Sequence, residues 1–370
     1  MIRILFALLV LSSFSMAADT KYPVDIAPIL EPVLKKSKLP SLAGAVWLGD
    51  EIRGLGASGV RQMGDPTPVT KDDKYHIGSC TKMMTATLAA ILIEDGLLSW
   101  ETTIGEVLDR EVRNIHPDFL DVSIEQLLAH VGGFPKNPPR KTWAAAWENQ
   151  GRMKPEKQRM IFVTDMLQAR PAYKPGAKTV YSNQGYAVAG VMLETLAKKP
   201  WEELLRTRIF EPLKMSSAGF RAPGSEAKID QPRGHNGKKP VVPEPDKADN
   251  PDAIGPAGTV HLSMQDWAKY AGFLLKRNPG MILKNPESFD KLNSTLPNSG
   301  RHGVGGCLVQ DIPAMGGHCL QMAGSNTMWY SLLWIIPDYD MAIVVATNSA
   351  PASAFGTCDK AVVALIQEFK

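Results

Sequence analysis

A helix with almost no polar face begins near Ser79, and it constrains the fold more than any other stretch of the chain. Residues at spacings of three and four predict this helix until Gly96 ends it: Met83, Met84, Thr87, Leu88, Ile91 and Leu92. A helix this apolar is expected to be buried, because an exposed helix carries a polar face. The chain has 370 residues, 44% of them hydrophobic, which is enough for a large core in two lobes.

Alternating patterns near both ends of the chain predict antiparallel strands. From Leu42, the residues Ala43, Ala45 and Trp47 alternate with smaller or polar ones, turn at Gly49-Asp50 and resume through Ile52. Residues 328–336 and 341–347 predict two further strands joined by a turn at 337–340, and residues 361–369 predict a closing amphipathic helix. The expected fold class is α/β (α+β), with an antiparallel sheet flanked by N- and C-terminal helices and an inserted all-helical lobe.

The middle of the chain is expected to be mainly helical. Amphipathic stretches recur between residues 124 and 215, including 143–147 and 185–197. Residues 222–256 are rich in proline, glycine and charge and predict a long loop. We therefore expect an α/β lobe from residues 19–78 and 256–370, and a mainly helical lobe from 79–255 that ends in the proline-rich loop.

The first residues are typical of a secretory signal. Arg3 precedes a short apolar run, which small residues follow up to Ala17 and Ala18. A membrane anchor needs about 18 or more apolar residues, and this run is shorter. We expect residues 1–18 to be a signal peptide and the mature protein to be periplasmic or secreted, without stable membrane insertion.

The charge and the remaining motifs favour no nucleic-acid partner and no cofactor. The net charge is +3 without a basic run. The sequence has no C-x-x-C pair and its histidines are scattered, which disfavours a zinc site. Residues 54–59 match G-x-G-x-x-G, but the proline-rich stretch after them cannot form the helix that a dinucleotide site requires.

The four cysteines leave two alternatives open. An oxidising compartment allows one disulfide, and Cys307 and Cys319 flank a turn that would bring them opposite each other. Four buried free thiols are the other possibility, since cysteine packs well as a small hydrophobic residue.

Ser79 and Lys82 form the candidate catalytic pair. A serine hydroxyl needs a base before it becomes a useful nucleophile, and a lysine three residues further along a helix lies on the same face. Burial near the positive end of the helix biases that amine toward its neutral form. Two other S-x-x-K tetrads begin at Ser225 and Ser288, but neither precedes a buried helix.

Tyr181-Ser182-Asn183 is the second element of this candidate site. A tyrosine hydroxyl beside a lysine ammonium is expected to have a lowered pKa and to move protons. The Asn183 amide can donate to and accept from groups around a substrate carbonyl.

The motifs taken together resemble those of the class C β-lactamase and related esterase family. The resemblance runs in order through Ile77–Lys82, Leu127–Pro135, Lys174–Tyr186, Pro256–Trp267 and Ile336–Asn348. It implies a β-lactamase/transpeptidase-like fold and a serine acyl-transfer site between its two lobes. In that site Ser79 is the nucleophile, Lys82 and Tyr181 carry protons, and Asn183 contacts the substrate.

The resemblance also suggests further substrate-binding residues. Relatives place an amide that touches the acyl group near Asn137. The family's third motif, Lys or His followed by any residue and Gly, reads His318-Cys319-Leu320 here, which places the bulky Leu320 where the family has glycine. By position, the backbone N–H of Gln321 is then expected to be the second oxyanion donor, with Gly324 at a later family glycine.

These residues predict an exported serine hydrolase that acts through an acyl-enzyme on a small ester or amide. Histidine at position 318 would be mostly neutral, unlike a lysine that anchors a substrate carboxylate, and this favours a carboxylesterase. A β-lactamase or D-Ala carboxypeptidase is the alternative enzyme. A non-catalytic binding protein that kept the fold is the alternative of another class.

Overall fold

The computed structural model describes residues 23–244 and 247–370. The predicted signal peptide, residues 1–18, lies outside these ranges.

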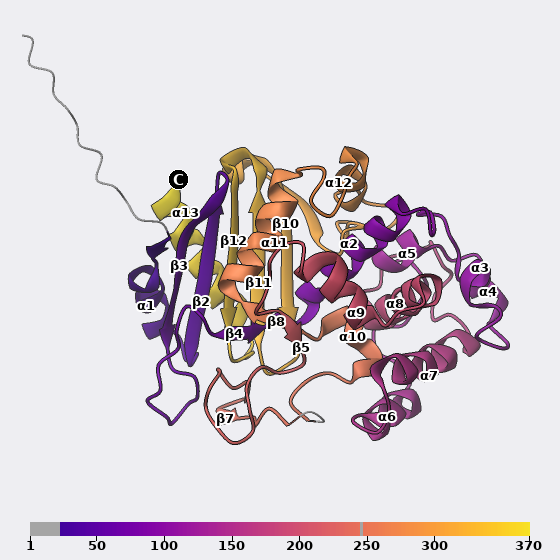
Figure 1. Ribbon diagram of the computed structural model, residues 1–370, viewed down its shortest axis with the longest axis horizontal. Helices are drawn as coiled ribbons and strands as arrows, with labels where there is room; N and C mark the ends of the chain where they lie inside the picture. Colours follow the sequence, from indigo (N-terminus) through magenta and orange to yellow (C-terminus); the bar gives the residue numbers. More distant parts are fainter. Residues whose placement is uncertain (1–22, 245–246) are drawn as a thin grey trace, which may run out of the picture.

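A seven-stranded sheet forms one half of the molecule, with the strand order β1-β3-β2-β12-β11-β10-β9 (Figure 1). Neighbouring strands are antiparallel except for β1 and β3. The strands are β1 (Val24–Asp25), β2 (Ser41–Leu48), β3 (Glu51–Gly59), β9 (Leu308–Ile312), β10 (Gly317–Ser325), β11 (Tyr330–Ile336) and β12 (Met341–Thr347). This confirms the two predicted hairpins. However, β11 begins only at Tyr330, because the backbone N–H groups of Met328 and Trp329 donate to the side chain of Asn326.

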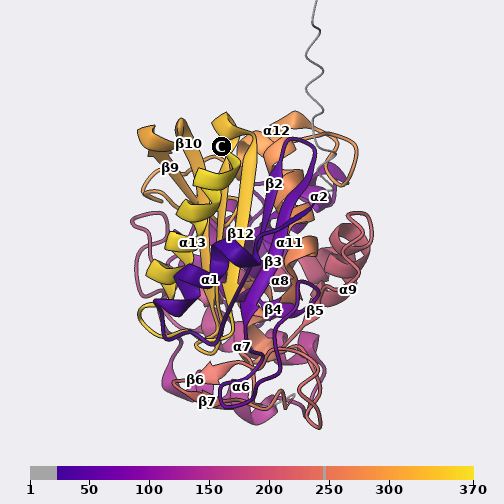
Figure 2. The same ribbon diagram turned by 90° about the vertical axis from the view of Figure 1, so that its left-hand side faces the viewer.

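Helices cover both faces of the sheet. One face packs against α1 (Ala27–Lys35) and α13 (Ala354–Phe369), which lie in front of the sheet in Figure 2. The other face packs against α11 (Met264–Lys276). The closing helix starts earlier than the predicted 361, because Ala354, Thr357 and Cys358 continue its buried face toward the N-terminus.

The other half of the molecule is mainly helical (Figure 1). Its helices are α2 (Thr81–Glu94), α3 (Ile104–Leu108), α4 (Pro117–Leu120), α5 (Ile124–Leu128), α6 (Arg140–Asn149), α7 (Pro155–Gln168), α8 (Asn183–Ala197), α9 (Trp201–Leu205), α10 (Gly255–Gly258) and α12 (Pro286–Leu292). Every residue from Thr81 to Leu92 is buried, which confirms the predicted buried helix. The fold class is therefore the expected one, a sheet with terminal helices and a helical insertion.

Short elements connect the two halves. A three-stranded sheet joins β4 (Lys74–His76), β8 (Val260–Ser263) and β5 (Gly219–Phe220), and β4 leads into the single turn η1 (Gly78–Cys80). In its described part, residues 222–244 and 247–256, the proline-rich stretch forms the small hairpin of β6 (His235–Asn236) and β7 (Lys239–Pro240), the turn η3 (Asp252–Ile254) and the start of α10. Three further turns are η2 (Arg206–Phe210), η4 (Pro313–Met315) and η5 (Pro337–Tyr339).

All four cysteines are free and buried. Cys307 packs in the core on the α2 side of the sheet, whereas Cys319 packs in the core beneath α1 and α13. The sheet therefore separates the two residues that would have formed the disulfide, and the alternative of four buried thiols describes the structure.

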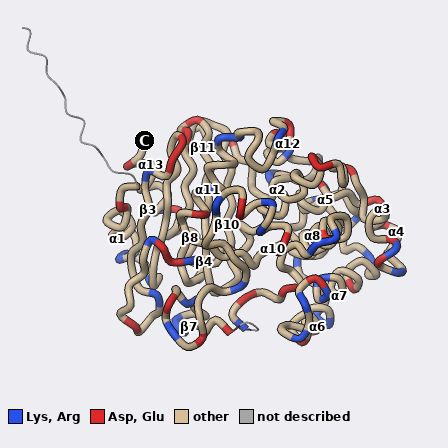
Figure 3. Tube along the Cα trace, in the orientation of Figure 1, with Lys and Arg blue, Asp and Glu red and all other residues tan. Residues whose placement is uncertain are grey.

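Basic and acidic residues are interspersed along the chain trace (Figure 3). Within residues 23–244 and 247–370, no helix combines the length and the apolar character needed to cross a membrane.

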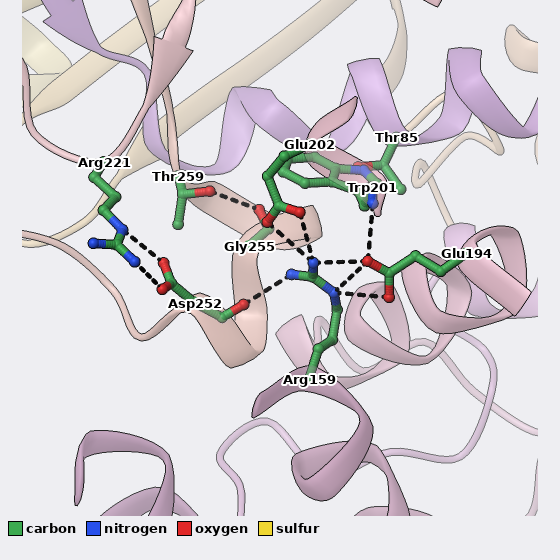
Figure 4. Close-up of polar contacts among 9 residues, drawn as sticks. All are labelled: Thr85, Arg159, Glu194, Trp201, Glu202, Arg221, Asp252, Gly255 and Thr259. Atoms are coloured by element: carbon green, nitrogen blue, oxygen red, sulfur yellow. Dashed lines mark hydrogen bonds and ion pairs between the residues drawn. The ribbon is translucent and has the colours of Figure 1, made fainter. Parts of the chain in front are cut away.

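Arg159 links the helices of the helical half through buried ion pairs (Figure 4). Its guanidinium on α7 is fully buried and lies 2.8 Å from the Glu194 carboxylate on α8 and 2.9 Å from the Glu202 carboxylate on α9. It also donates to the backbone oxygen of Asp252 at 2.8 Å, and the Asp252 carboxylate pairs with Arg221. One side chain thus holds α7, α8, α9 and η3 together.

We expect Arg159→Met to lower the free energy of unfolding by about 3–5 kcal/mol, because it leaves two carboxylates buried without their cation. Urea denaturation measures this value. The matched control is Arg208→Met, which breaks a more exposed pair with Asp95 at 2.6 Å and is expected to cost less than about 1 kcal/mol. Equal losses in the two variants would contradict the role given to Arg159.

Candidate active site

Ser79 lies in the single turn between β4 and the buried helix α2. Its neighbours Gly78 and Cys80 are buried, whereas Ser79 itself is partly exposed. The left-handed backbone of Gly78, with φ of +49°, lets the chain leave β4 and enter the turn. The nucleophile candidate is therefore reachable from solvent yet supported by a rigid element on each side.

Two glycines allow strand β10 to touch this turn. A Cβ atom on Gly324 would lie 2.0 Å from the carbonyl oxygen of Ile77, and one on Gly78 would lie 2.4 Å from the backbone nitrogen of Ser325. Neither position has room for a side chain. The backbone of Ser325 is thus the part of β10 beside the nucleophile's turn.

Lys82 lies one helical turn beyond Ser79, and its side chain is fully buried. Its Nζ atom lies 3.2 Å from Ser79 Oγ, 2.8 Å from Asn183 Oδ1 and 2.7 Å from the carbonyl oxygen of Ala257. Burial lowers the pKa of the Lys82 amine to about 7, so the neutral form is well populated near neutral pH.

The three oxygen contacts fix the direction in which the lone pair of the neutral Lys82 amine points. Carbonyl and amide oxygens only accept hydrogen bonds, so the two N–H bonds of a neutral Lys82 are directed at Ala257 and Asn183. Its lone pair then faces the one partner with a hydrogen to donate, the Ser79 hydroxyl. The structure thus orients Lys82 to accept the proton of Ser79, whereas the sequence pattern placed the two residues only on one face of a helix.

Tyr181 lies beside both residues. Lys82 Nζ is 4.8 Å from the centre of the Tyr181 ring, and the Ser79 hydroxyl is near enough to the phenol to act on its pKa. Burial raises the pKa of Tyr181, and the Ser79 hydroxyl offsets this only in part. The expectation of a lowered Tyr181 pKa is therefore wrong: desolvation outweighs the nearby amine and keeps the phenol protonated.

Two histidines hold the Tyr181 ring. The ring centre of His130 lies 4.5 Å and that of His302 lies 6.1 Å from the ring centre of Tyr181. His130 Nδ1 also accepts a hydrogen bond from the backbone N–H of Ser182 at 3.2 Å. His302 was not identified from the sequence, because no motif marks it.

His318 and Gln321 do not lie where the sequence placed them. His318 is exposed and pairs with Asp311 on β9; it lies six residues before Gly324, about 20 Å along the strand. Gln321 shares the sheet face of Cys319 and Ala323, away from α2, and accepts a hydrogen bond from Gln310 at 2.8 Å.

This corrects the third motif. The glycine that meets the nucleophile's turn is Gly324, with Met322 and Ala323 before it, so the backbone N–H beside Ser79 belongs to Ser325 rather than to Gln321. Leu320 is buried in the core and does not replace a glycine of the site. The sequence did single out Gly324, but as a later landmark.

Asn137 and Asn183 line one cavity of about 330 Å³. The extended backbone of Ser182 points the side chains of Tyr181 and Asn183 to the same side of the chain. The Asn183 side chain thus contacts the Lys82 amine and also lines the cavity to which the predicted binding residue Asn137 belongs.

A buried polar network supports the turn of Ser79 from behind. His76 Nδ1 accepts from the backbone N–H of Gly78 at 3.0 Å, and its Nε2 lies 2.8 Å from the Asp249 carboxylate. The same carboxylate accepts from Asn326 at 2.9 Å, one residue beyond Ser325. The network therefore ties the nucleophile's turn to the end of β10.

The remaining sequence candidates lie elsewhere. Ser288 donates to Glu94 on the far end of α2, and the Ser225 backbone is bonded to Asp230 in the proline-rich loop. Among the residues that the structure describes, no group of three or more His, Cys, Asp and Glu side chains is placed to hold a metal ion.

Comparison with known proteins identifies the family to which these motifs belong. A family model described as "Beta-lactamase" matches residues 26–368, which is nearly the whole chain.

Two relatives match over most of the chain. An unguisins hydrolase from Aspergillus campestris is 26% identical over 349 residues, or 90% of this chain, and the match spans 62% of the fungal protein's length. Penicillin-binding protein 4 from Amycolatopsis lactamdurans is 27% identical over 341 residues, covering 86% of this chain and 83% of the relative.

The solved structures share the fold. The octameric penicillin-binding protein homologue from Pyrococcus abyssi superposes with a TM-score of 0.73 at 22% identity, covering 92% of this chain and 76% of that chain. The predicted β-lactamase/transpeptidase-like fold is thereby confirmed.

We expect covalent labelling of Ser79 to accelerate as the pH rises through about 7 and then to level off, because the deprotonated amine is the base and dominates above its pKa. The second-order rate constant with a fluorophosphonate, measured from pH 5 to 10, reports this pKa. In Lys82→Ala we expect labelling to slow by about 10²–10⁴-fold and to lose this inflexion. An inflexion near the ordinary lysine value of 10.5 would contradict a neutral Lys82.

Proposed function

Because this chain belongs to the β-lactamase family of serine hydrolases, we propose that it is an exported carboxylesterase that forms an acyl-enzyme on Ser79. The observation that carries this proposal is the contact of the buried Lys82 amine with the Ser79 hydroxyl at 3.2 Å. A base in this position supplies what an isolated serine lacks.

In the proposed acylation step, Lys82 Nζ accepts the Ser79 proton while Oγ bonds to the substrate carbonyl carbon. The carbonyl oxygen becomes an oxyanion beside the backbone N–H groups of Ser79 and Ser325, which stabilise its charge. Tyr181 donates its proton to the departing alkoxide and regains one from Lys82. Water then bonds to the acyl carbon and passes its proton through the same groups to Ser79 Oγ, so that the bond between the acyl carbon and Oγ breaks and the acid is released.

The corrected third motif supports an ester as the substrate. The residues before Gly324 are Met322 and Ala323, and neither carries a charge that would anchor the carboxylate of a β-lactam or a D-alanyl peptide on β10. The preference for an ester therefore rests on the uncharged Met322 and Ala323 and not on a neutral His318, which lies away from the site.

We expect a fluorophosphonate to add one adduct to the protein, and peptide mass spectrometry to locate it on Ser79. Ser79→Ala should lose the adduct and all hydrolysis, because Ser79 supplies the hydroxyl among the groups that contact the Lys82 amine in the described part of the chain. The matched control is Ser225→Ala, which removes the serine of another S-x-x-K tetrad and should label like the wild type. A chain that carries no adduct under these conditions would be a non-catalytic member of the family.

Three substrates separate the remaining alternatives. A short-chain p-nitrophenyl ester should be hydrolysed with a higher kcat/KM than nitrocefin or a D-Ala-D-Ala peptide. The reverse order would replace the carboxylesterase by a β-lactamase or a D-Ala carboxypeptidase with the same acyl-serine chemistry.

Export is proposed from the N-terminal sequence alone. Expression of the full chain in a bacterium with a periplasm should give a protein shortened at Ala17 or Ala18, with Edman or mass analysis showing the new N-terminus. Replacing the apolar run by polar residues should keep the protein in the cytoplasm at full length. An uncleaved chain in the soluble cytoplasmic fraction of the wild type would refute the signal.

A further inference from the structure

The cavity beside Asn183 carries positive charge without a compensating acid. Its lining contains two cations and four amides and no acidic side chain within the described part of the chain: Lys136, Arg140, Asn137, Asn183, Gln184 and Asn250. In residues 23–244 and 247–370, Lys136 and Arg140 take part in no ion pair. Both side chains are exposed, like that of Lys141, and no acidic side chain of the described residues holds either of them.

Two helices begin at this cavity. Helix α6 starts at Arg140 and α8 at Asn183, and neither has an acidic residue in its first turn or a side chain that caps its N–H groups. The partial positive charge of a helix N-terminus adds to that of the two cations. Asn250 fixes the opposite wall, since its side chain donates to the Gly258 carbonyl at 2.8 Å.

The position of the cavity relative to Ser79 indicates which part of a substrate would occupy it. Tyr181, which donates the leaving-group proton in the proposed mechanism, faces the His130 and His302 rings. Asn183, two residues on, faces the cavity. Asn183 also bonds to the Lys82 amine that contacts Ser79, so an acyl group held on Ser79 lies within reach of the cavity on the other side of the Asn183 side chain.

We propose that this cavity selects acyl groups that end in a carboxylate. Its volume of about 330 Å³ holds a chain of several carbons, and its two cations meet the charge at the far end. The uncharged Met322 and Ala323 leave β10 without an anion anchor, so recognition of a carboxylate shifts from that strand to the acyl side. This inference rests on the proposed acyl-enzyme function.

Two esters with the same leaving group test the selection. They are the p-nitrophenyl monoester of adipic acid, which ends in a carboxylate, and its methyl-capped diester of nearly equal length, which carries no charge. We expect kcat/KM to be roughly tenfold higher for the charged ester at low ionic strength, and this preference to shrink with added salt. The ratio of the two values cancels any general change in activity.

Substitutions assign the preference to the cavity. Lys136→Gln and Arg140→Gln should each lower the ratio by about twofold to fivefold, and Arg140→Glu should lower it further. The matched control is Lys141→Gln, which removes an exposed cation from the same helix outside the cavity lining and should leave the ratio unchanged. A wild-type ratio near one, or equal effects of all the Gln variants, would overturn the proposal while leaving the esterase intact.

A binding measurement decides the proposal even without turnover. Isothermal titration of the wild type with adipate and with the neutral adipamide should give tighter binding of adipate, and Arg140→Gln should remove that difference. Equal affinities would overturn the cavity's charge preference. Failure of both esters to react, together with no adduct on Ser79, would instead overturn the proposed function.

Discussion

The site depends on the desolvation of a single amine. Lys82 lies on a helix whose first three turns are entirely buried, and that burial brings its pKa to about 7. The neutral amine donates its two N–H bonds to the oxygens of Asn183 and Ala257, so its lone pair points at Ser79. The same low-polarity surroundings keep Tyr181 a neutral phenol beside this amine. Exposure of this helix would give an ordinary ammonium and an unactivated serine.

Close backbone contact between the two halves of the molecule completes the site. Gly78 and Gly324 let the nucleophile's turn and β10 approach more closely than any side chain would allow. Behind them, the buried His76, Asp249 and Asn326 link the turn to the strand end. Such fixed backbone donors stabilise a developing oxyanion because they need no reorganisation during the reaction.

Charge is distributed unevenly around this centre. The buried guanidinium of Arg159 pairs with two carboxylates and holds helices together, whereas Lys136 and Arg140 line the cavity without an ion pair to any described residue. This chain matches 62% of the length of the fungal relative, which is therefore the longer protein.

The sequence by itself determined the elements whose signals are local. The period-two patterns predicted the β2–β3 and β11–β12 hairpins, and the apolar run after Ser79 predicted a buried helix with Lys82 one turn along. Tertiary structure alone decided which part of β10 lies beside Ser79. The strand Gly317–Ser325 has glycines near both ends, and its contact with Ile77 shows that Gly324, rather than the segment around His318, meets the turn of Ser79. It also decided that Cys307 and Cys319 lie in the cores on opposite sides of the sheet. At Tyr181 it decided that burial raises the pKa of the phenol despite the nearby amine. These outcomes depend on which distant segments surround a residue, and short-range sequence patterns carry no such information.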